Sequence, residues 1–210
     1  MSFKSYTMSI KREVPEVSAG SMADIAFLLL IFFLVTTTIE TNVGLDRKLP
    51  SSSESSPVAE KNLLRVNLNA TNELLVDGEL LPIDQLRDKT ISFLDNGGSI
   101  EGTSGYCSYC KGKGDIASSD NPQKAIISLS NKRETNYGVY IAVQNELVGA
   151  YNFLRNRESL RLYAVSYIEL LDAYKNPEVS DAEKQDLKIR LKKIKDLFPQ
   201  KISEVEINNN

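Results

Sequence analysis

The sequence predicts an α+β protein in which one N-terminal membrane-spanning helix precedes a small domain, a mixed sheet backed by helices. Three observations predict this class. Ile25–Val35 is a run of eleven consecutive apolar residues. Apolar residues alternate at Leu64, Val66 and Leu68 and again, after a turn, at Leu74 and Val76, as in half-buried strands. After Asn136, apolar residues recur every three or four positions, which is typical of a helix covering a sheet.

The composition excludes several classes of function. Of the 210 residues, 41% are hydrophobic and 25% are charged, which fits neither a disordered nor a disulfide-dense chain. The chain contains no His, so histidine general bases and Ser-His-Asp or Cys-His catalysis are ruled out. With 25 cationic and 28 anionic groups, no basic excess is left to neutralise phosphates, and nucleic acid is not an expected partner.

Residues 19–41 are expected to form the transmembrane helix. The only charge in Ala19–Ile39 is Asp24, and these 21 residues would span about 31 Å as a helix, the thickness of a bilayer core. A cleaved signal peptide and a buried core helix are the alternatives. The long leader with Glu13 and Glu16 disfavours the first, and the polarity of the remaining chain disfavours the second. Cations are nearly equal on both sides, so charge alone does not set the orientation.

Asp24 is the most informative residue. It lies five residues from Leu29, or about 7.5 Å along a helix axis, still within the expected hydrocarbon region. A carboxylate there costs about 2.5–3.5 kcal/mol, which protonation, a water-filled cavity or a polar partner must offset. The sequence has no second apolar segment of this length, so such a partner is expected in another molecule. The hydroxyls of Thr36, Thr37 and Thr38 either continue a polar track or bond to their own backbone.

The segment SMADIAFLLLIFFLVTTTI, followed by Leu49–Pro50, resembles the ExbD/TolR family of energy-transducing inner-membrane proteins. The resemblance implies that Asp24 is the proton-carrying residue and that Leu49 and Pro50 belong to an extended segment that takes part in coupling. Protons would then be the coupling ion, with no cofactor and no enzymatic activity. The chain would be a motor subunit that couples proton entry to TonB-dependent or Tol-like transport across the envelope.

The resemblance also implies a topology and partners. Residues 1–18 would be a cytoplasmic leader, residues 42–61 a periplasmic linker and residues 62–210 a periplasmic α/β domain, in a single-pass protein of the bacterial inner membrane. A homodimer would sit inside a ring of an ExbB/TolQ-like multi-pass protein and act on a TonB-like or TolA-like protein. The alternative function is a passive membrane-anchored envelope protein that binds a partner or peptidoglycan, with Asp24 serving only in helix assembly.

The expected elements of the domain follow from local patterns. Two strands form a hairpin, with a turn at Asn69–Asn72. A helix opens at Pro82 and ends at Gly97–Gly98, and Ser180 with Glu183 forms a capping box before a later helix. The remaining expectations are a short buried strand at Ala125–Ser130, a long helix from Asn136 and a closing strand that contains Val205 and Ile207.

An inserted loop at residues 96–122 departs from the family pattern. It is rich in Gly and Ser and carries the only two cysteines, Cys107 and Cys110, in the sequence CSYCKGKG. This sequence resembles one copy of the CxxCxGxG zinc repeat of DnaJ-type chaperones, but one copy supplies only two thiolates where structural zinc usually takes four ligands. Three interpretations stay open: a local disulfide, a redox-active pair, or zinc shared between two chains.

Overall fold

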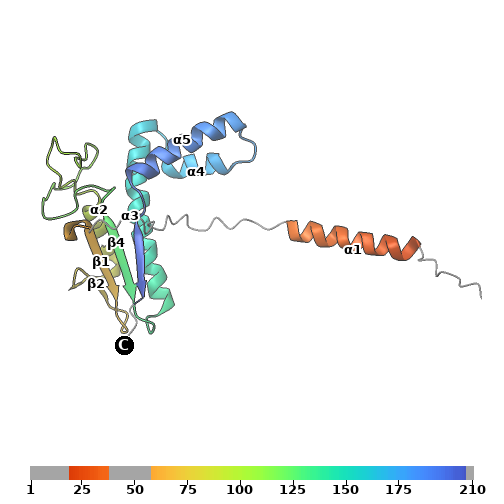
Figure 1. Cartoon of the computed structure of the whole chain (residues 1–210), viewed down its shortest axis with the longest axis horizontal. Helices are drawn as coiled ribbons and strands as arrows, with labels where there is room; N and C mark the ends of the chain where they lie inside the picture. The colour runs from red at the N-terminus through yellow and green to blue at the C-terminus, as the bar shows by residue number, and fades with distance from the viewer. Residues whose placement is uncertain (1–18, 38–57, 207–210) are drawn as a thin grey trace, which may run out of the picture. The chain divides into compact units, whose positions relative to one another are not determined.

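The computed structural model describes residues 19–37 and 58–206, which fall in two units, Met1–Asp46 and Arg47–Asn210. The first unit contains the helix α1, Ala19–Thr37. The second contains five strands and the four other helices described (Figure 1). The expected leader, Leu49–Pro50 and most of the expected linker lie outside the described residues.

Helix α1 is apolar on all sides, and its large side chains from Met22 to Phe33 are exposed. In the described part of the chain, no helix combines the length and apolar character needed to cross a membrane. The expected span of residues 19–41 is therefore not confirmed. It is four residues longer than α1, and its last residues, 38–41, lie outside the described part.

The second unit is built on a mixed sheet with the strand order β3-β2-β1-β4-β5. The strands are β1 (Leu63–Leu68), β2 (Leu74–Val76), β3 (Glu79–Leu80), β4 (Ile126–Asn131) and β5 (Ile202–Glu206). β1 pairs with β2 antiparallel and with β4 parallel, and β5 joins the far side of β4 in parallel. The strands β3 and β5 are thus the two edges of the sheet.

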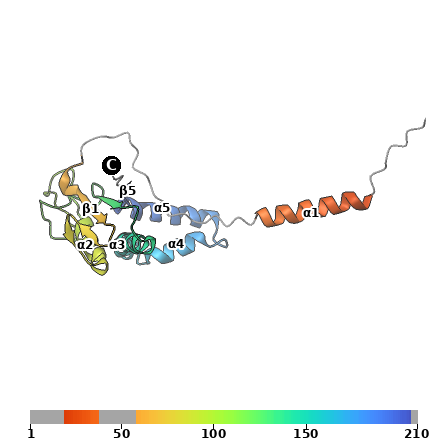
Figure 2. The same ribbon diagram turned by 90° about the horizontal axis from the view of Figure 1, so that it is seen from below.

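Helices cover one face of this sheet. α2 (Ile83–Leu94) and α3 (Tyr137–Tyr163) pack against each other on the same side of the strands (Figure 2). Along β1, Leu64, Val66 and Leu68 are buried under them while Arg65 on the opposite face is exposed. This alternation of buried and more exposed side chains is typical of a sheet with one covered and one open face.

The chain between α3 and β5 forms a helical hairpin beyond the end of the sheet. α4 (Tyr167–Lys175) and α5 (Asp181–Leu197) pack side by side around a small core of Tyr167, Leu170, Leu191 and Ile194 (Figures 1 and 2). Each helix begins with a capping box, Ser166 with Glu169 in α4 and Ser180 with Glu183 in α5.

Most of the expected elements of the domain are confirmed. The first hairpin, the helix after Pro82, the long helix after Asn136 and the capping box at Ser180 are present. The expected strand at Ala125–Ser130 is shifted by one residue, and the helix that Gly97–Gly98 was expected to end stops at Leu94. The closing strand contains Val205, while Ile207 lies outside the described residues.

The edge strand β3 was not expected. β2 and β3 are joined by the two residues Asp77 and Gly78, which have φ angles of 50° and 87°. Two consecutive left-handed residues are what a tight type I′ hairpin turn requires, and Asp-Gly is among the pairs best suited to it. The Asp77-Gly78 pair is therefore the sequence signal for this second hairpin.

Candidate functional site

Asp24 lies in the second turn of α1 and is the only charged residue in Ala19–Thr37. Its side chain is exposed in this unit. At helical spacing it shares a face with Gly20 and Ser21 one turn earlier and with Leu28 one turn later. Small residues let a neighbouring helix approach closely, so this face of α1 allows another helix to come near the carboxylate.

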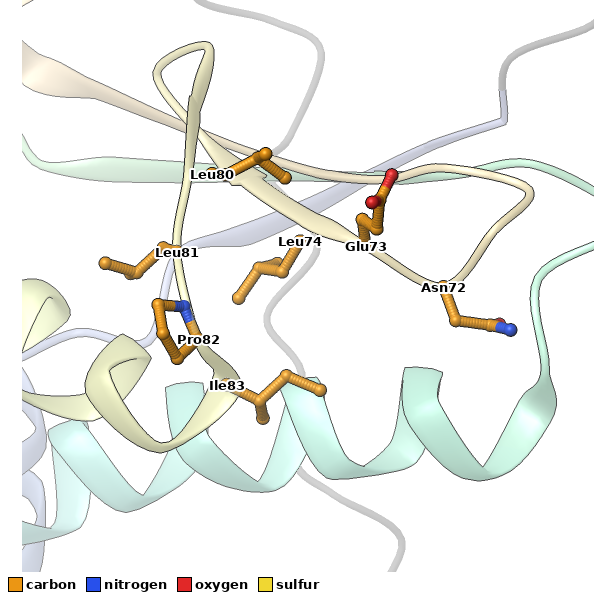
Figure 3. A pocket seen from close by; sticks show the side chains of 7 residues that line it. All are labelled: Asn72, Glu73, Leu74, Leu80, Leu81, Pro82 and Ile83. Atoms are coloured by element: carbon orange, nitrogen blue, oxygen red, sulfur yellow. The ribbon is translucent and has the colours of Figure 1, made fainter.

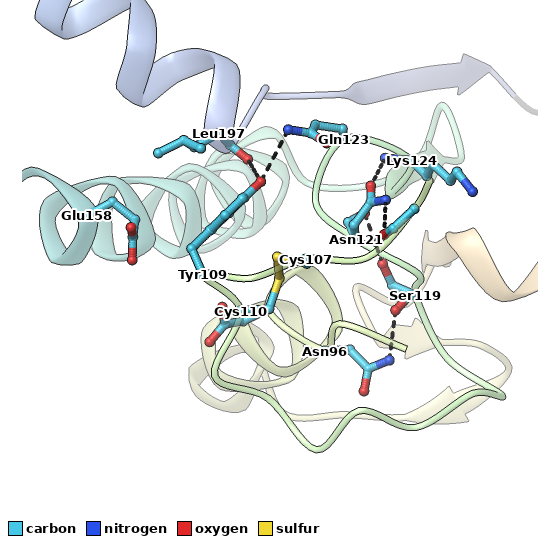
Figure 4. The surroundings of a disulfide bond; sticks show 12 residues. Asn96, Cys107, Tyr109, Cys110, Ser119, Asn121, Gln123, Lys124, Glu158 and Leu197 are labelled. Carbon is cyan, nitrogen blue, oxygen red and sulfur yellow. Dashed lines mark hydrogen bonds between the residues drawn. A yellow bond between two sulfur atoms is a disulfide. The ribbon is translucent and has the colours of Figure 1, made fainter. Parts of the chain in front are cut away.

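The two cysteines of the inserted loop are joined in a disulfide, Cys107–Cys110 (Figure 4). Of the three interpretations of this pair, the structure has the disulfide. Cys107 is buried, with 7% of its surface exposed, while Cys110 is half-buried. Among the described residues, no group of three or more His, Cys, Asp or Glu side chains is placed to hold a metal ion.

Side-chain amides hold the inserted loop in place although it has no helix or strand among its described residues. The buried Asn96 amide nitrogen donates to the carbonyl oxygens of Asp115 and Ser119, and its oxygen accepts from the backbone N–H of Asp115. A backbone hydrogen bond also holds the loop: the N–H of Gly112 donates to the carbonyl of Asp95 at 2.9 Å. A Cβ at Gly112 would lie 2.4 Å from that same oxygen, so the close approach requires glycine.

Tyr109, between the two cysteines, inserts into the junction between α5 and β5. Its hydroxyl donates to the carbonyl of Leu197 at 2.9 Å, and its ring meets the buried Phe198 ring edge-on at 5.5 Å between centroids (Figure 4). Burial, together with the negative charges of Glu158 and Asp95, raises the pKa of Tyr109 to about 12. Tyr109 is therefore a neutral hydrogen-bond donor at physiological pH.

A network of charged side chains around the buried Glu158 lies near this junction. Arg157 forms two bonds to the carboxylate of Asp95, at 2.6 and 2.8 Å, and its Nε lies 3.3 Å from the fully buried Glu158. Arg161 donates to the other Glu158 oxygen at 2.7 Å. The hydrogen bond to Asp95 raises the pKa of Arg157. This network could not be predicted from the sequence, because periodicity does not show which charges on a long helix are buried with a partner.

A second charged cluster fixes the loop to the start of β1. Asp120 accepts from Lys61 at 2.5 Å and from Asn62 and Lys124 at 3.2 Å each. Burial opposes ionisation here, but the hydrogen bonds from Lys61, Asn62 and Lys124 prevail and lower the pKa of Asp120 to about 2. Asn62 also accepts from the Asp120 backbone N–H at 2.8 Å. These contacts are structural ties between the loop and the sheet.

An open pocket of about 300 Å³ lies between the β2–β3 hairpin and the start of α2 (Figure 3). Its lining is mainly aliphatic, with Leu74, Leu80, Leu81 and Ile83, and Glu73 is the one ionisable residue in it. Hydrogen bonds from Asn69 and Thr71 occupy the Glu73 carboxylate and lower its pKa. The lining thus holds no second ionisable group to pair with Glu73 in acid–base chemistry.

Comparison with known families identifies the chain. The family model described as "Biopolymer transport protein ExbD/TolR" matches residues 10–155. The chain belongs to the ExbD/TolR family. The match runs from before α1 through β1, β2, α2, the inserted loop and β4 into α3, and it ends before the α4–α5 hairpin. No curated protein matches the chain.

Membership of the ExbD/TolR family confirms the resemblance inferred from the span. It places the chain among biopolymer transport proteins, a class whose members act in transport. Asp24 lies within the matched region, as do Cys107 and Cys110.

Proposed function

We propose that the chain is a proton-carrying motor subunit that couples proton entry across the bacterial inner membrane to TonB-dependent or Tol-like transport. The observation that carries this proposal is Asp24, the lone charge in the apolar segment of an ExbD/TolR chain. A biopolymer transport protein needs an energy source, and an acid in a membrane helix is the group that can take up and release protons there.

The proposed arrangement places residues 19–41 across the inner membrane, residues 1–18 in the cytoplasm and residues 62–210 in the periplasm, with 42–61 as the linker. The apolar run Ile25–Val35 supports the membrane segment, because its large side chains from Ile25 to Phe33 are exposed and a bilayer would cover them. The cost of placing Asp24 in hydrocarbon supports a partner helix, since the carboxylate needs a polar neighbour or water when ionised.

The proposed partners follow from the same requirement. Two copies of the chain would sit inside a ring of an ExbB/TolQ-like multi-pass protein, whose helices surround Asp24 on its Gly20–Ser21 face. Each proton that crosses the membrane releases about 2.3 kcal/mol per 100 mV, which is available for relative movement of ring and core. The periplasmic domain would pass the movement to a TonB-like or TolA-like protein. The role is transport and requires no enzymatic step.

The test is uptake of a large substrate that depends on the proton-motive force, in cells with wild type, Asp24→Asn or Asp24→Glu. The amide keeps the size and polarity of the acid but does not titrate, so we expect Asp24→Asn to abolish uptake, whereas Asp24→Glu keeps a titratable group and part of the activity. Membrane level and co-purification with the ring protein are measured in parallel. Full uptake by Asp24→Asn at normal complex levels would contradict the proposal and favour a passive anchored protein.

A further inference from the structure

The junction between α5 and β5 is held from two sides. Leu197 and Phe198 end α5, and the last carbonyls of a helix lack partners within it. The Leu197 carbonyl accepts from the Tyr109 hydroxyl. The Phe198 carbonyl accepts from Nε and Nη2 of the buried Arg155 at 3.1 and 2.9 Å. The inserted loop therefore holds the junction at Leu197, and α3 holds it at Phe198.

Lys201, further along the junction, also forms hydrogen bonds to both sides. The Lys201 N–H donates to the Tyr151 hydroxyl of α3, and its ammonium group donates to the carbonyl of Gln123, the residue that follows the loop. Gln123 also donates to the Tyr109 hydroxyl at 3.3 Å (Figure 4). β5 begins at Ile202, four residues after Phe198, and within the described part of the chain its one neighbouring strand is β4. The position of this edge strand thus depends on contacts made by the loop.

The two cysteines of the disulfide flank Tyr109, which makes the contact with Leu197. Cys107 and Cys110 enclose Tyr109 in a closed loop of four residues, and Cys110 lies against Gly97, whose added Cβ would be 2.9 Å from the Cys110 Cβ. A cross-link of this kind limits the conformations that the enclosed residue can reach when the loop opens. The segment that places Tyr109 in the junction therefore cannot extend while the disulfide is intact.

We propose that the Cys107–Cys110 disulfide holds Tyr109 in the α5–β5 junction, so that its reduction by a dithiol loosens edge strand β5 while the rest of the sheet stays folded. A dithiol thiolate attacks the less buried Cys110 sulfur and displaces the Cys107 thiolate. The second thiol of the reductant then displaces Cys110 and closes its own disulfide. Two electrons and two protons pass to the protein, which gains two thiols. This inference does not rest on the proposed function.

The test is amide hydrogen exchange on the full chain in detergent, before and after treatment with dithiothreitol, with thiol titration to count the cysteines released. We expect exchange in residues 198–206 to become about five times faster or more on reduction, the change that follows from losing one net hydrogen bond. Exchange in β1 is expected to stay the same. Unchanged exchange in 198–206 after full reduction, or an equal rise in β1 and β5, would overturn the proposal.

Two variants separate the disulfide from the tyrosine contact. Tyr109→Phe keeps the ring and the cross-link but removes the hydroxyl, so residues 198–206 should exchange faster even when oxidised, and reduction should then add less than in wild type. Tyr106→Phe, at an exposed tyrosine of the same loop, serves as the matched control and should behave as wild type. A full additional effect of reduction in Tyr109→Phe would show that the disulfide acts by another route and would overturn the role assigned to Tyr109.

Discussion

At the scale of single residues, the domain relies on a few buried polar groups whose partners lie far away in sequence. Asn62 and Asp120 join the inserted loop to the start of β1, Asn96 ties the beginning of the loop to its end, and Arg157 joins α3 to the end of α2. Buried polar groups stabilise a fold only when they are satisfied, and each of these groups is hydrogen-bonded. The loop is thereby an ordered part of the domain without regular secondary structure.

The Asp120 cluster predicts a specific dependence of stability on pH. The pKa of Asp120 is about 2 in the folded protein, against an ordinary value of 3.8. Between these values the unfolded state binds more protons, so stability falls as the pH falls. The contribution of the ionised group is complete above about pH 4 and is lost as the pH approaches 2. Asp120→Asn should therefore be less stable than wild type at pH 6 and equal to it near pH 2.

Thermal unfolding of wild type and Asp120→Asn from pH 2 to 6 measures this effect. Asp88→Asn, at an exposed position on α2, is the control for removal of one carboxylate, and its difference from wild type should be small at every pH. A difference between Asp120→Asn and wild type that stays constant from pH 2 to 6 would show that the ionised carboxylate does not stabilise the fold.

At the scale of elements, the α4–α5 hairpin depends on its helix starts because its core is small. The Ser180 hydroxyl accepts from the Glu183 N–H, and the Glu183 carboxylate accepts from the Ser180 N–H. Ser180→Ala removes one bond of this capping box and should cost about 1 kcal/mol. Amide exchange in the first turn of α5 should then be about five times faster, with β1 unchanged. Ser104→Ala, at an exposed serine of the inserted loop, is the control; equal exchange in both variants would contradict the role of the cap.

Sequence patterns predicted the elements that have a strong period or a cap. The alternation around Val66 fixed the register of β1 relative to the helices, because a shift of one residue would turn its apolar side chains to solvent. The edge strand β3 was not predicted because its two residues are too few to show an alternation of apolar and polar side chains. Its sequence signal is the Asp77-Gly78 turn. The contacts of Tyr109 could not be predicted, because they link residues 88 positions apart through an irregular loop.

Asp24 was found for a different physical reason. A charge in an apolar run stands out from the sequence alone, since its cost does not depend on the details of packing. Its partner could not be found in the same way, because no second apolar segment of this chain supplies one. The role of Asp24 stays a prediction from the sequence, and the geometry of the proposed site would depend on another molecule.

At the scale of the whole molecule, this ExbD/TolR chain has two units: one contains a helix with a single acid, and the other is a domain whose inserted loop carries a disulfide. The family match covers α1 and the strands β1 to β4, and it ends within α3, before the α4–α5 hairpin and the edge strand β5. Asp24→Asn should therefore leave the domain folded, and reduction of Cys107–Cys110 should leave the proposed proton transfer at Asp24 unchanged.

The central claim is that Asp24 carries protons, and proton entry into vesicles tests it most directly. The full chain is reconstituted with its ring partner, a membrane potential is imposed, and an enclosed pH-sensitive dye reports acidification. The account predicts proton entry with wild type, reduced entry with Asp24→Glu, and only the leak of protein-free vesicles with Asp24→Asn at equal complex content. Proton entry at the wild-type rate with Asp24→Asn would contradict it.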